Sequence, residues 1–218
     1  MSDDALLALL PIEQRLALAY GARAARAALL TVLALDARLA SAVRAAREPV
    51  LGQIKLAWWR ENLAGGGARE TSPEPLLARI AAEPLDQPAL IALVDGWEGM
   101  VGAGPVGSDA LAALAEARAL ALAGAGARLA PASGYAEALR AARNWALADL
   151  AARLSRPEER DAAIALAARQ DWSRPTLPRA LRALAVLHGL ARRRHDGRPL
   201  LAEKRAFAVA LRLGLLNV

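Results

Sequence analysis

Apolar residues recur every three or four positions along almost the whole chain, which is the spacing that gives a helix one buried face. This pattern predicts about nine or ten helices with short connections. They cover residues 3–10, 12–46, 48–63, 72–82, 87–100, 108–129, 134–154, 156–169, 176–194 and 200–215, with a break at Gly21. No segment shows the alternation of period two that is typical of a half-buried strand. The sequence therefore predicts an all-α fold in one compact multi-helix domain over residues 1–218.

The segment EPVLGQIKLAWWRENL, residues 48–63, holds two adjacent tryptophans in a chain with only five Trp, one Phe and two Tyr. Read as a helix, it carries two apolar stripes. One consists of Leu51, Ile54 and Trp58, and the other of Gly52, Leu56, Trp59 and Leu63. A helix that is apolar on two sides is typical of a central position, so we expect it between neighbours. Its polar residues would reach the remaining gap: Lys55, Arg60 and Glu61.

Two glycine-rich stretches predict loops between the helices. GGGARETSP at 65–73 is the clearest, and GAGPVG at 102–107 is the second. The first does not fit a phosphate-binding loop, because no Lys-Ser/Thr follows the glycines and no strand precedes them. Ser155 and Glu158 have the spacing of a capping box and predict the start of the helix over 156–169.

Alanine and leucine dominate the hydrophobic residues, which make up 56% of the 218 positions. Both favour helices, whereas the β-branched residues that favour strands are few. The cleanest apolar runs, 27–35 and 119–127, fall far short of the ~20 residues that a membrane span requires. The first residues, MSDDALLALLP, carry two acids where a signal peptide has basic residues. We expect a cytoplasmic protein without a transmembrane segment, for which peripheral contact with the inner membrane stays open.

The net charge of +6 comes almost wholly from arginine, because Lys55 and Lys204 are the only lysines. This surplus fits anionic partners such as diphosphates, acidic lipid surfaces or acidic proteins. The hypothesis of a nucleic-acid-binding protein would be supported by the sequence pI of 10.8 alone. The tryptophans are spread over several segments rather than along one stacking face, so we expect no nucleic acid as a partner.

The cysteine and histidine counts exclude several kinds of site. With no cysteine, the chain has no disulfide, no thiolate zinc site and no cysteine nucleophile. Two histidines are too few for a transition-metal site built from protein ligands alone, so we expect no such metal site. His188 lies in the apolar stretch AVLHGLA, which favours a buried structural role. His195 follows three arginines, which suit the end of a helix.

Paired carboxylates are the feature by which an all-α protein can hold Mg²⁺ against a diphosphate, because Asp or Glu at i and i+4 share a helix face. The chain has no D-x-x-x-D motif, and Asp36 and Asp149 each stand alone. Asp95 and Glu98 share a face, which is typical of the solvated side of a helix. The residues taken alone therefore indicate no metal-binding carboxylate pair.

The segment from Glu48 to Leu63 resembles the phrase E-P-x-L-G-x-I-R-L-x-W-W-R-x-x-L of the squalene/phytoene synthase family. Weaker similarities follow in the same order at 89–102, 138–154 and 177–193, so the resemblance covers most of the chain. Members of this family are all-α synthases that join two farnesyl or geranylgeranyl units head to head in isoprenoid biosynthesis. The resemblance implies an isoprenoid-synthase domain, truncated relative to typical catalytic members.

Active members of that family carry two Asp-rich motifs, which face each other and hold Mg²⁺ on the substrate diphosphates. At the first place this chain has LTVLALDARLASA and keeps Asp36; at the second it has AARNWALADLAARL and keeps Asn144 and Asp149. Without the other carboxylates, the ionisation of an allylic diphosphate loses its main electrostatic help. One mitochondrial branch of the family also lacks these motifs and serves as an assembly factor for respiratory complex I.

The resemblance leads to two hypotheses. The first is a pseudoenzyme without cofactors that acts as an assembly, lipid-binding or partner-binding factor, with a protein or an isoprenoid lipid as its partner. The second is a divergent transferase that uses Mg²⁺ to condense farnesyl or geranylgeranyl diphosphate. The catalytic candidates are Asp36 and Asp149, and the binding candidates are Arg38, Lys55, Trp58, Trp59 and Arg60. The pattern leaves open whether a central cavity remains between the helices.

Overall fold

A computed structural model gives the structure of the protein and describes residues 2–65, 74–127, 132–201 and 204–215. In these ranges the chain forms eleven α-helices, one short 3₁₀ helix and no strand. Their bounds are α1 Asp3–Leu7, α2 Ile12–Ala19, α3 Arg23–Ala45, α4 Pro49–Ala64, α5 Pro75–Ala82, α6 Gln87–Glu98, α7 Ser108–Ala127, α8 Ala132–Arg153, α9 Pro157–Ala168, η1 Arg179–Leu181, α10 Arg182–Arg192 and α11 Lys204–Leu215.

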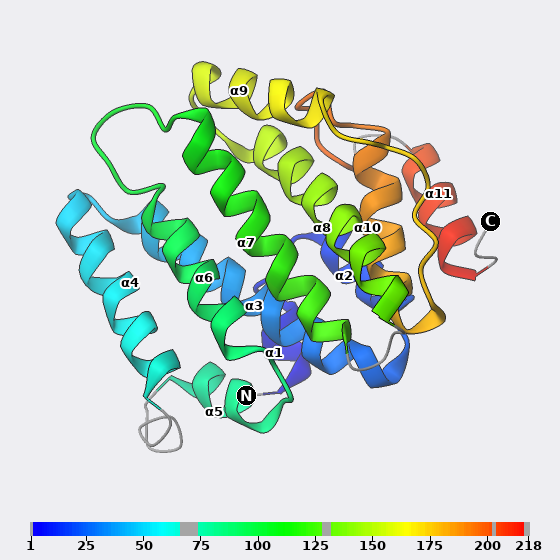
Figure 1. Ribbon diagram of the computed structural model, residues 1–218, viewed down its shortest axis with the longest axis horizontal. Coiled ribbons are helices and arrows are strands. Elements are labelled where there is room, and N and C mark those ends of the chain that lie inside the picture. Colours follow the sequence, from blue (N-terminus) through cyan, green and yellow to red (C-terminus); the bar gives the residue numbers. More distant parts are fainter. Residues whose placement is uncertain (1, 66–73, 128–131, 202–203, 216–218) are drawn as a thin grey trace.

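The all-α prediction is confirmed for the part of the chain that the structure describes (Figure 1). The break expected at Gly21 separates α2 from α3, and the second predicted loop joins α6 to α7. The first predicted loop lies, apart from Gly65, outside the described residues. None of the described helices has the length and the apolar character that crossing a bilayer requires.

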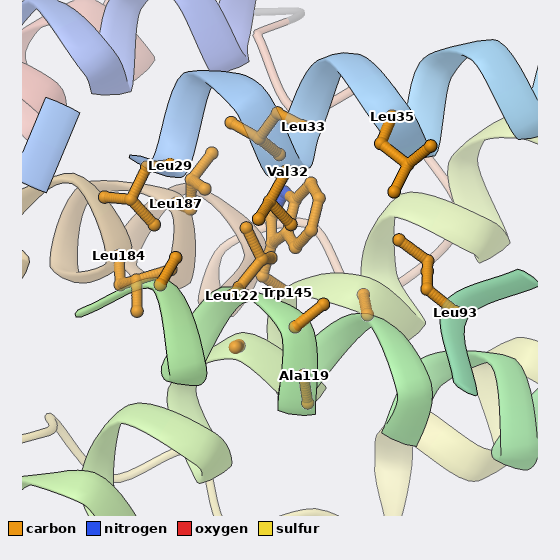
Figure 2. Close-up of a cluster of buried hydrophobic side chains, with 14 of the residues drawn as sticks. Leu29, Val32, Leu33, Leu35, Leu93, Ala119, Leu122, Trp145, Leu184 and Leu187 are labelled. Atoms are coloured by element: carbon orange, nitrogen blue, oxygen red, sulfur yellow. The ribbon is translucent and has the colours of Figure 1, made fainter. Parts of the chain in front are cut away.

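The centre of the molecule is α3, whose side chains are buried without interruption from Ala28 to Asp36. Helices α6 and α7 pack against it, α8 packs on α7, and α10 packs on α8. Figure 2 shows Trp145 of α8 in the hydrophobic core with Val32 of α3 and Leu122 of α7. Because an aromatic ring buries roughly 150–250 Å², Trp145 is a principal contact between these three helices.

Small side chains bring α6, α7 and α8 close together. Six alanines of α8 are fully buried: Ala138, Ala141, Ala142, Ala146, Ala148 and Ala151. A Cβ atom added to Gly96 of α6 would lie 3.1 Å from Cα of Leu114 on α7. Interiors packed this tightly hold side chains in fixed positions, so polar groups that project from these helices are well placed for a defined site.

The tryptophan helix is α4, and it lies at the edge of the molecule (Figure 1). One predicted stripe is buried: Gly52, Leu56, Trp59 and Leu63. The other is exposed, since Ile54 is 61% and Trp58 is 38% exposed. The prediction of a central helix is therefore wrong. An apolar stripe shows that a face avoids water, but it does not show that this chain supplies the neighbour that covers it.

One capping prediction is also wrong. The N-cap of α9 is Arg156 rather than Ser155, and it makes no side-chain hydrogen bond at the cap. Pro157 takes the first helical position instead, where a residue without an N–H leaves no donor unpaired. The neighbouring Glu159 accepts a hydrogen bond from the backbone N–H of Val106 at 2.9 Å, which ties the loop after α6 to α9.

Candidate functional site

A cavity of about 890 Å³ opens between α3 and α8, with the α1–α2 connection and the loop after α6 as further walls. Its buried end is formed by charged and polar side chains from four helices: Asp36 of α3, Trp97 of α6, Arg118 of α7 and Asp149 of α8. A cluster of buried charges is stable only when its members are paired. The contacts of these four side chains therefore decide what the cavity can bind.

Asp36 is fully engaged by two donors. The indole N–H of Trp97 donates to Oδ1 at 2.8 Å. Arg118 donates to Oδ2 from Nε at 3.0 Å and from Nη2 at 2.7 Å. Both oxygens of this carboxylate therefore accept hydrogen bonds from within the protein, and one of the donors carries a full positive charge.

Arg118 also reaches Asp149, so one guanidinium bridges carboxylates from two different helices. Its Nη2 donates to Oδ2 of Asp149 at 2.9 Å, and its Nη1 donates to the carbonyl of Ala146 at 3.4 Å. The guanidinium carbon lies 4.5 Å from the ring centroid of Trp145, a cation–π distance. The cation is thus bound on its edge by carboxylates and on its face by an aromatic ring.

A second arginine pairs with the outer side of Asp149. Arg153 donates from Nε to Oδ1 of Asp149 at 2.7 Å and pairs through Nη2 with Glu13 of α2. Two arginines therefore face three carboxylates, counting Asp36 and Asp149 with Glu13. The network links α2, α3, α7 and α8 by charge-assisted hydrogen bonds.

The pKa values of the network follow from burial opposed by the neighbouring charges. Burial alone would raise the pKa of Asp149, but the guanidiniums of Arg118 and Arg153 hold it below its usual value. Burial would likewise lower the pKa of Arg118, and the charges of Asp36 and Asp149 raise it instead. The ionised form of Asp149 and the protonated form of Arg118 are therefore the stable ones near neutral pH.

The residues at the buried end do not fit a Mg²⁺ ion. Magnesium needs carboxylate oxygens that are free to coordinate it, and both Asp36 and Asp149 are bound to Arg118. Within the described ranges, no three His, Cys, Asp or Glu side chains group in a way that could hold a metal ion. The cationic position between the two aspartates is filled by the guanidinium of Arg118.

The outer part of the cavity has a basic rim and apolar walls. Four arginines line it: Arg38, Arg44, Arg153 and Arg156. Arg38 and Arg156 approach carboxylates only at 3.9 Å, too far for a direct hydrogen bond. The apolar lining comes from Leu9, Leu10, Val43, Met100, Val106, Leu150 and Leu154. Such a lining suits a ligand with an anionic head and a hydrocarbon chain.

Gln14 of α2 adds an unsatisfied polar group to the cavity wall. Its side chain is only 4% exposed, and its Oε1 accepts no hydrogen bond from the described part of the protein. A buried amide oxygen without a partner costs stability, so such groups are few in native proteins. Gln14 therefore leaves one unsatisfied polar atom within the wall of the cavity.

The residues singled out from the sequence fall into two places. Asp36, Asp149 and Arg38 line the cavity, and Arg118 joins the two aspartates. The other four candidates lie on α4 and do not line it: Lys55, Trp58, Trp59 and Arg60. Lys55 is exposed, and Trp58 packs edge-on against Trp59 with ring centroids 5.2 Å apart.

Arg60 holds α4 against α6. Its Nε donates to Oδ1 of Asp95 at 2.7 Å, and its Nη2 pairs with Glu98. Asp95 and Glu98 share a face as the spacing indicates, but they serve as the partners of this arginine rather than only as a solvated surface. Helical spacing does not connect Arg60 with these two acids, because the contacts span 35 and 38 positions.

Arg118 is the residue of this candidate site that is not among the sequence-based candidates. It is the only basic residue of α7, and it sits among alanines and leucines in a helix that is otherwise almost uncharged. Two isolated aspartates on apolar helices each need a buried counter-ion. A lone arginine on a third apolar helix is the signal that could have identified it.

The protein is all-α in its described residues, and its large cavity ends at the ion pairs that Arg118 and Arg153 form with Asp36 and Asp149. Comparisons of the chain with protein-family models, with curated proteins and with solved structures give no match.

Proposed function

We propose that this chain is a non-catalytic protein of the squalene/phytoene synthase type, whose cavity binds an isoprenoid lipid or a related anionic amphiphile without a metal ion. The observation that carries the proposal is Arg118, which lies between Asp36 and Asp149 at the buried end of an open cavity. Of the roles that the resemblance implies, lipid binding is the one that the cavity supports.

The fixed guanidinium argues against prenyl transfer. Departure of an allylic diphosphate requires metal ions that neutralise the developing charge on the leaving group. Asp36 and Asp149 would have to release Arg118 to bind such ions, which would leave a buried arginine without partners. An uncompensated buried charge is strongly unfavourable, so the network favours binding over metal-dependent ionisation.

The shape of the cavity supports the class of ligand. A volume of about 890 Å³ is at the upper end of the range for small-molecule sites. The apolar walls would hold a prenyl chain, and Arg38 and Arg44 of α3 would face its phosphate groups at the rim. Guanidinium groups bind phosphates through paired N–H donors, and this contact needs no metal ion.

Calorimetric titration of farnesyl diphosphate tests the proposal, with EDTA in one series and Mg²⁺ in the other. We expect saturable binding of similar affinity in both. Arg44→Gln, at the rim, should weaken binding roughly tenfold, as expected for a lost charged hydrogen bond. Arg169→Gln is the matched control, because Arg169 lies at the end of α9 and does not line the cavity. Binding that requires Mg²⁺, or no binding at all, would refute the proposal.

A cavity-filling variant tests whether the ligand binds in the cavity or elsewhere on the surface. Ala37 of α3 lines the cavity, and Ala37→Phe would place a ring where the ligand chain is expected. We expect this variant to keep its fold by circular dichroism and to lose the binding heat. Unchanged binding would place the ligand elsewhere on the protein.

A further inference from the structure

A second, smaller cavity of about 140 Å³ lies between α10, α11 and the segment before η1. Four arginines line it: Arg174, Arg192, Arg193 and Arg212. The other lining residues are Pro175, Ala185, His188, Gly189, Val209 and Leu213, so the described lining contains no Asp or Glu. Arg192 and Arg193 form no ion pair with a carboxylate of the described residues, unlike the arginines at the buried end of the first cavity.

His188 of α10 is the one buried polar group in this lining, with only 2% of its surface exposed. Its Nε2 lies 3.4 Å from Nδ2 of Asn144. The same Nδ2 donates to the carbonyl of Asp171 at 2.7 Å, which fixes it as the amide nitrogen. Nε2 of His188 must then accept, so the neutral ring carries its proton on Nδ1.

The Nδ1–H donor of His188 has no hydrogen-bond acceptor in the part of the chain that the structure describes. The ring packs against Trp172, with centroids 5.6 Å apart, which limits its rotation. Nδ1 is not among the solvent-inaccessible polar atoms that lack a partner, so this donor is open to the cavity although the residue as a whole is buried. Its place in the lining of an arginine-rich cavity points to an acceptor that would come from a bound molecule.

The charges around His188 keep the ring neutral. Burial first, and then the positive charges of Arg140 on α8 and Arg192 on α10, lower its pKa to about 4 against the opposing effects of Asp171 and Glu137. Arg212 of α11 adds a charge from the remaining wall. An anion placed in the cavity would reverse part of this effect, because a negative charge favours the protonated ring.

The size of the cavity depends on a glycine. A Cβ atom added to Gly189 would lie 2.1 Å from Cδ1 of Leu213, so the close approach of α11 to α10 requires this residue. The result is a small hollow with apolar sides, Val209 and Leu213 among them, and guanidinium groups around it. It has room for one small anionic group and no room for a long chain.

We propose that this second cavity binds an oxyanion of the phosphate class, held by the guanidinium groups of Arg192 and Arg193 and by the Nδ1–H donor of His188. Arg174 and Arg212 also line the cavity and make other interactions as well. Within the described chain, neither Arg192 nor Arg193 forms an ion pair with a carboxylate. The phosphate can be free in solution or be the head group of a lipid.

Nuclear magnetic resonance of the His188 ring tests the proposal on the intact chain. Inorganic phosphate is titrated at pH 7, with sodium chloride of equal ionic strength as the control. We expect a saturable shift of the His188 signals with phosphate only, and a pKa that rises from about 4 by about one unit when phosphate is bound. A shift that is absent, or that chloride reproduces, would overturn the proposal.

Two arginine variants assign the contact. Arg192→Gln and Arg193→Gln should each weaken phosphate binding about tenfold, whereas Arg169→Gln on α9 should leave it unchanged. Circular dichroism confirms the fold of each variant, and the second variant keeps the test valid if the first does not fold. Equal phosphate affinity in all three variants would contradict the proposed site.

Sedimentation with vesicles distinguishes the two sources of phosphate. One set of vesicles contains phosphatidylcholine alone, and the other also contains phosphatidic acid. A His188 shift with phosphate together with Arg192-dependent binding to phosphatidic acid assigns a lipid head group. A His188 shift without vesicle binding assigns free phosphate. Vesicle binding without any shift of the His188 signals by phosphate would show that the protein binds membranes through its positive surface charge and not through this cavity. That result would overturn the proposal.

Discussion

The two cavities of this protein hold arginines in opposite electrostatic settings. At the buried end of the large cavity, Arg118 is bound to Asp36 and Asp149, and Arg153 pairs with Asp149 and Glu13. In the small cavity the arginines line a hollow whose described walls contain no carboxylate. In the first setting the protein supplies its own counter-ions, and in the second Arg192 and Arg193 pair with no carboxylate of the described residues.

The difference gives a rule for interpreting buried arginines. A guanidinium compensated by carboxylates from other helices joins those helices, and removing it leaves like charges facing each other. A group of arginines without carboxylates repels itself, so it weakens the fold until an anion binds. Mutations of the two groups should therefore have opposite effects on the free energy of unfolding.

The largest effect is expected for Arg118→Met. The substitution keeps an unbranched apolar stem but leaves Asp36 and Asp149 without their shared cation, at an expected loss of about 3–5 kcal/mol. Urea unfolding monitored by tryptophan fluorescence measures it. Arg143→Gln is the control, because Arg143 pairs with Glu116 near the surface and such pairs contribute about 0–1 kcal/mol. A loss below about 1 kcal/mol for Arg118→Met would contradict the account.

Restoring the charge balance should recover much of that loss. In the triple variant Asp36→Asn, Arg118→Met, Asp149→Asn, no charge of the bridge remains, and neutral replacements of buried ion networks are often tolerated. We expect it to be more stable than Arg118→Met alone. A triple variant that is less stable would show that packing around Arg118, rather than its charge, holds the helices.

The next effect is a dependence of stability on pH through His188. Its pKa is lowered from 6.5 to about 4 in the folded protein, so the unfolded chain binds the proton first as the pH falls. Stability should therefore be complete above pH 6.5 and decrease toward pH 4, by up to about 3 kcal/mol. His188→Gln should flatten this part of the profile in urea unfolding at a series of pH values.

Asp149 affects the pH dependence of stability in a different pH range, so it can be compared with His188 in the same protein. Its pKa is lowered from 3.8, so its contribution is present above that value and is lost only in stronger acid. If His188→Gln leaves the decrease between pH 6.5 and 4 intact, another group causes it, and the neutral buried histidine is not the reason.

The smallest effect distinguishes the second cavity from the first. Arg192→Gln and Arg193→Gln should leave the unfolding free energy unchanged or raise it by a few tenths of a kcal/mol, because each removes a mutually repelling charge. Phosphate should stabilise the unsubstituted protein more than either variant, by mass action on the folded state. A large destabilisation by either substitution would show that these arginines are structural like Arg118.

The fold class could be predicted from the sequence, but which apolar helix faces are exposed could not. The helical period placed α3 and α8 correctly, because their buried faces repeat every three or four residues. The same reasoning misplaced α4, since Leu51, Ile54 and Trp58 form a stripe as apolar as the buried one and yet are exposed. Periodicity describes one helix and carries no information about which neighbours the chain brings to it.

The candidate site was predicted in part. Asp36 and Asp149 were identified individually, but the bridge between them depends on Arg118, which lies 82 and 31 positions away in the chain. A contact over that distance follows only from the packing of α3, α7 and α8. The open cavity could not be predicted either, because alanines and leucines along its walls are equally compatible with helices that close on each other.

The most direct test of the central claim is a prenyl-transfer assay of the purified chain with labelled farnesyl diphosphate and Mg²⁺. The account predicts that the protein binds the substrate and forms no head-to-head product, because Asp36 and Asp149 are bound to the guanidinium of Arg118 and are not free to hold metal ions. Product that forms with the unsubstituted protein and is lost in Asp36→Asn would contradict it, and would show that the aspartates release Arg118 to do metal-dependent chemistry.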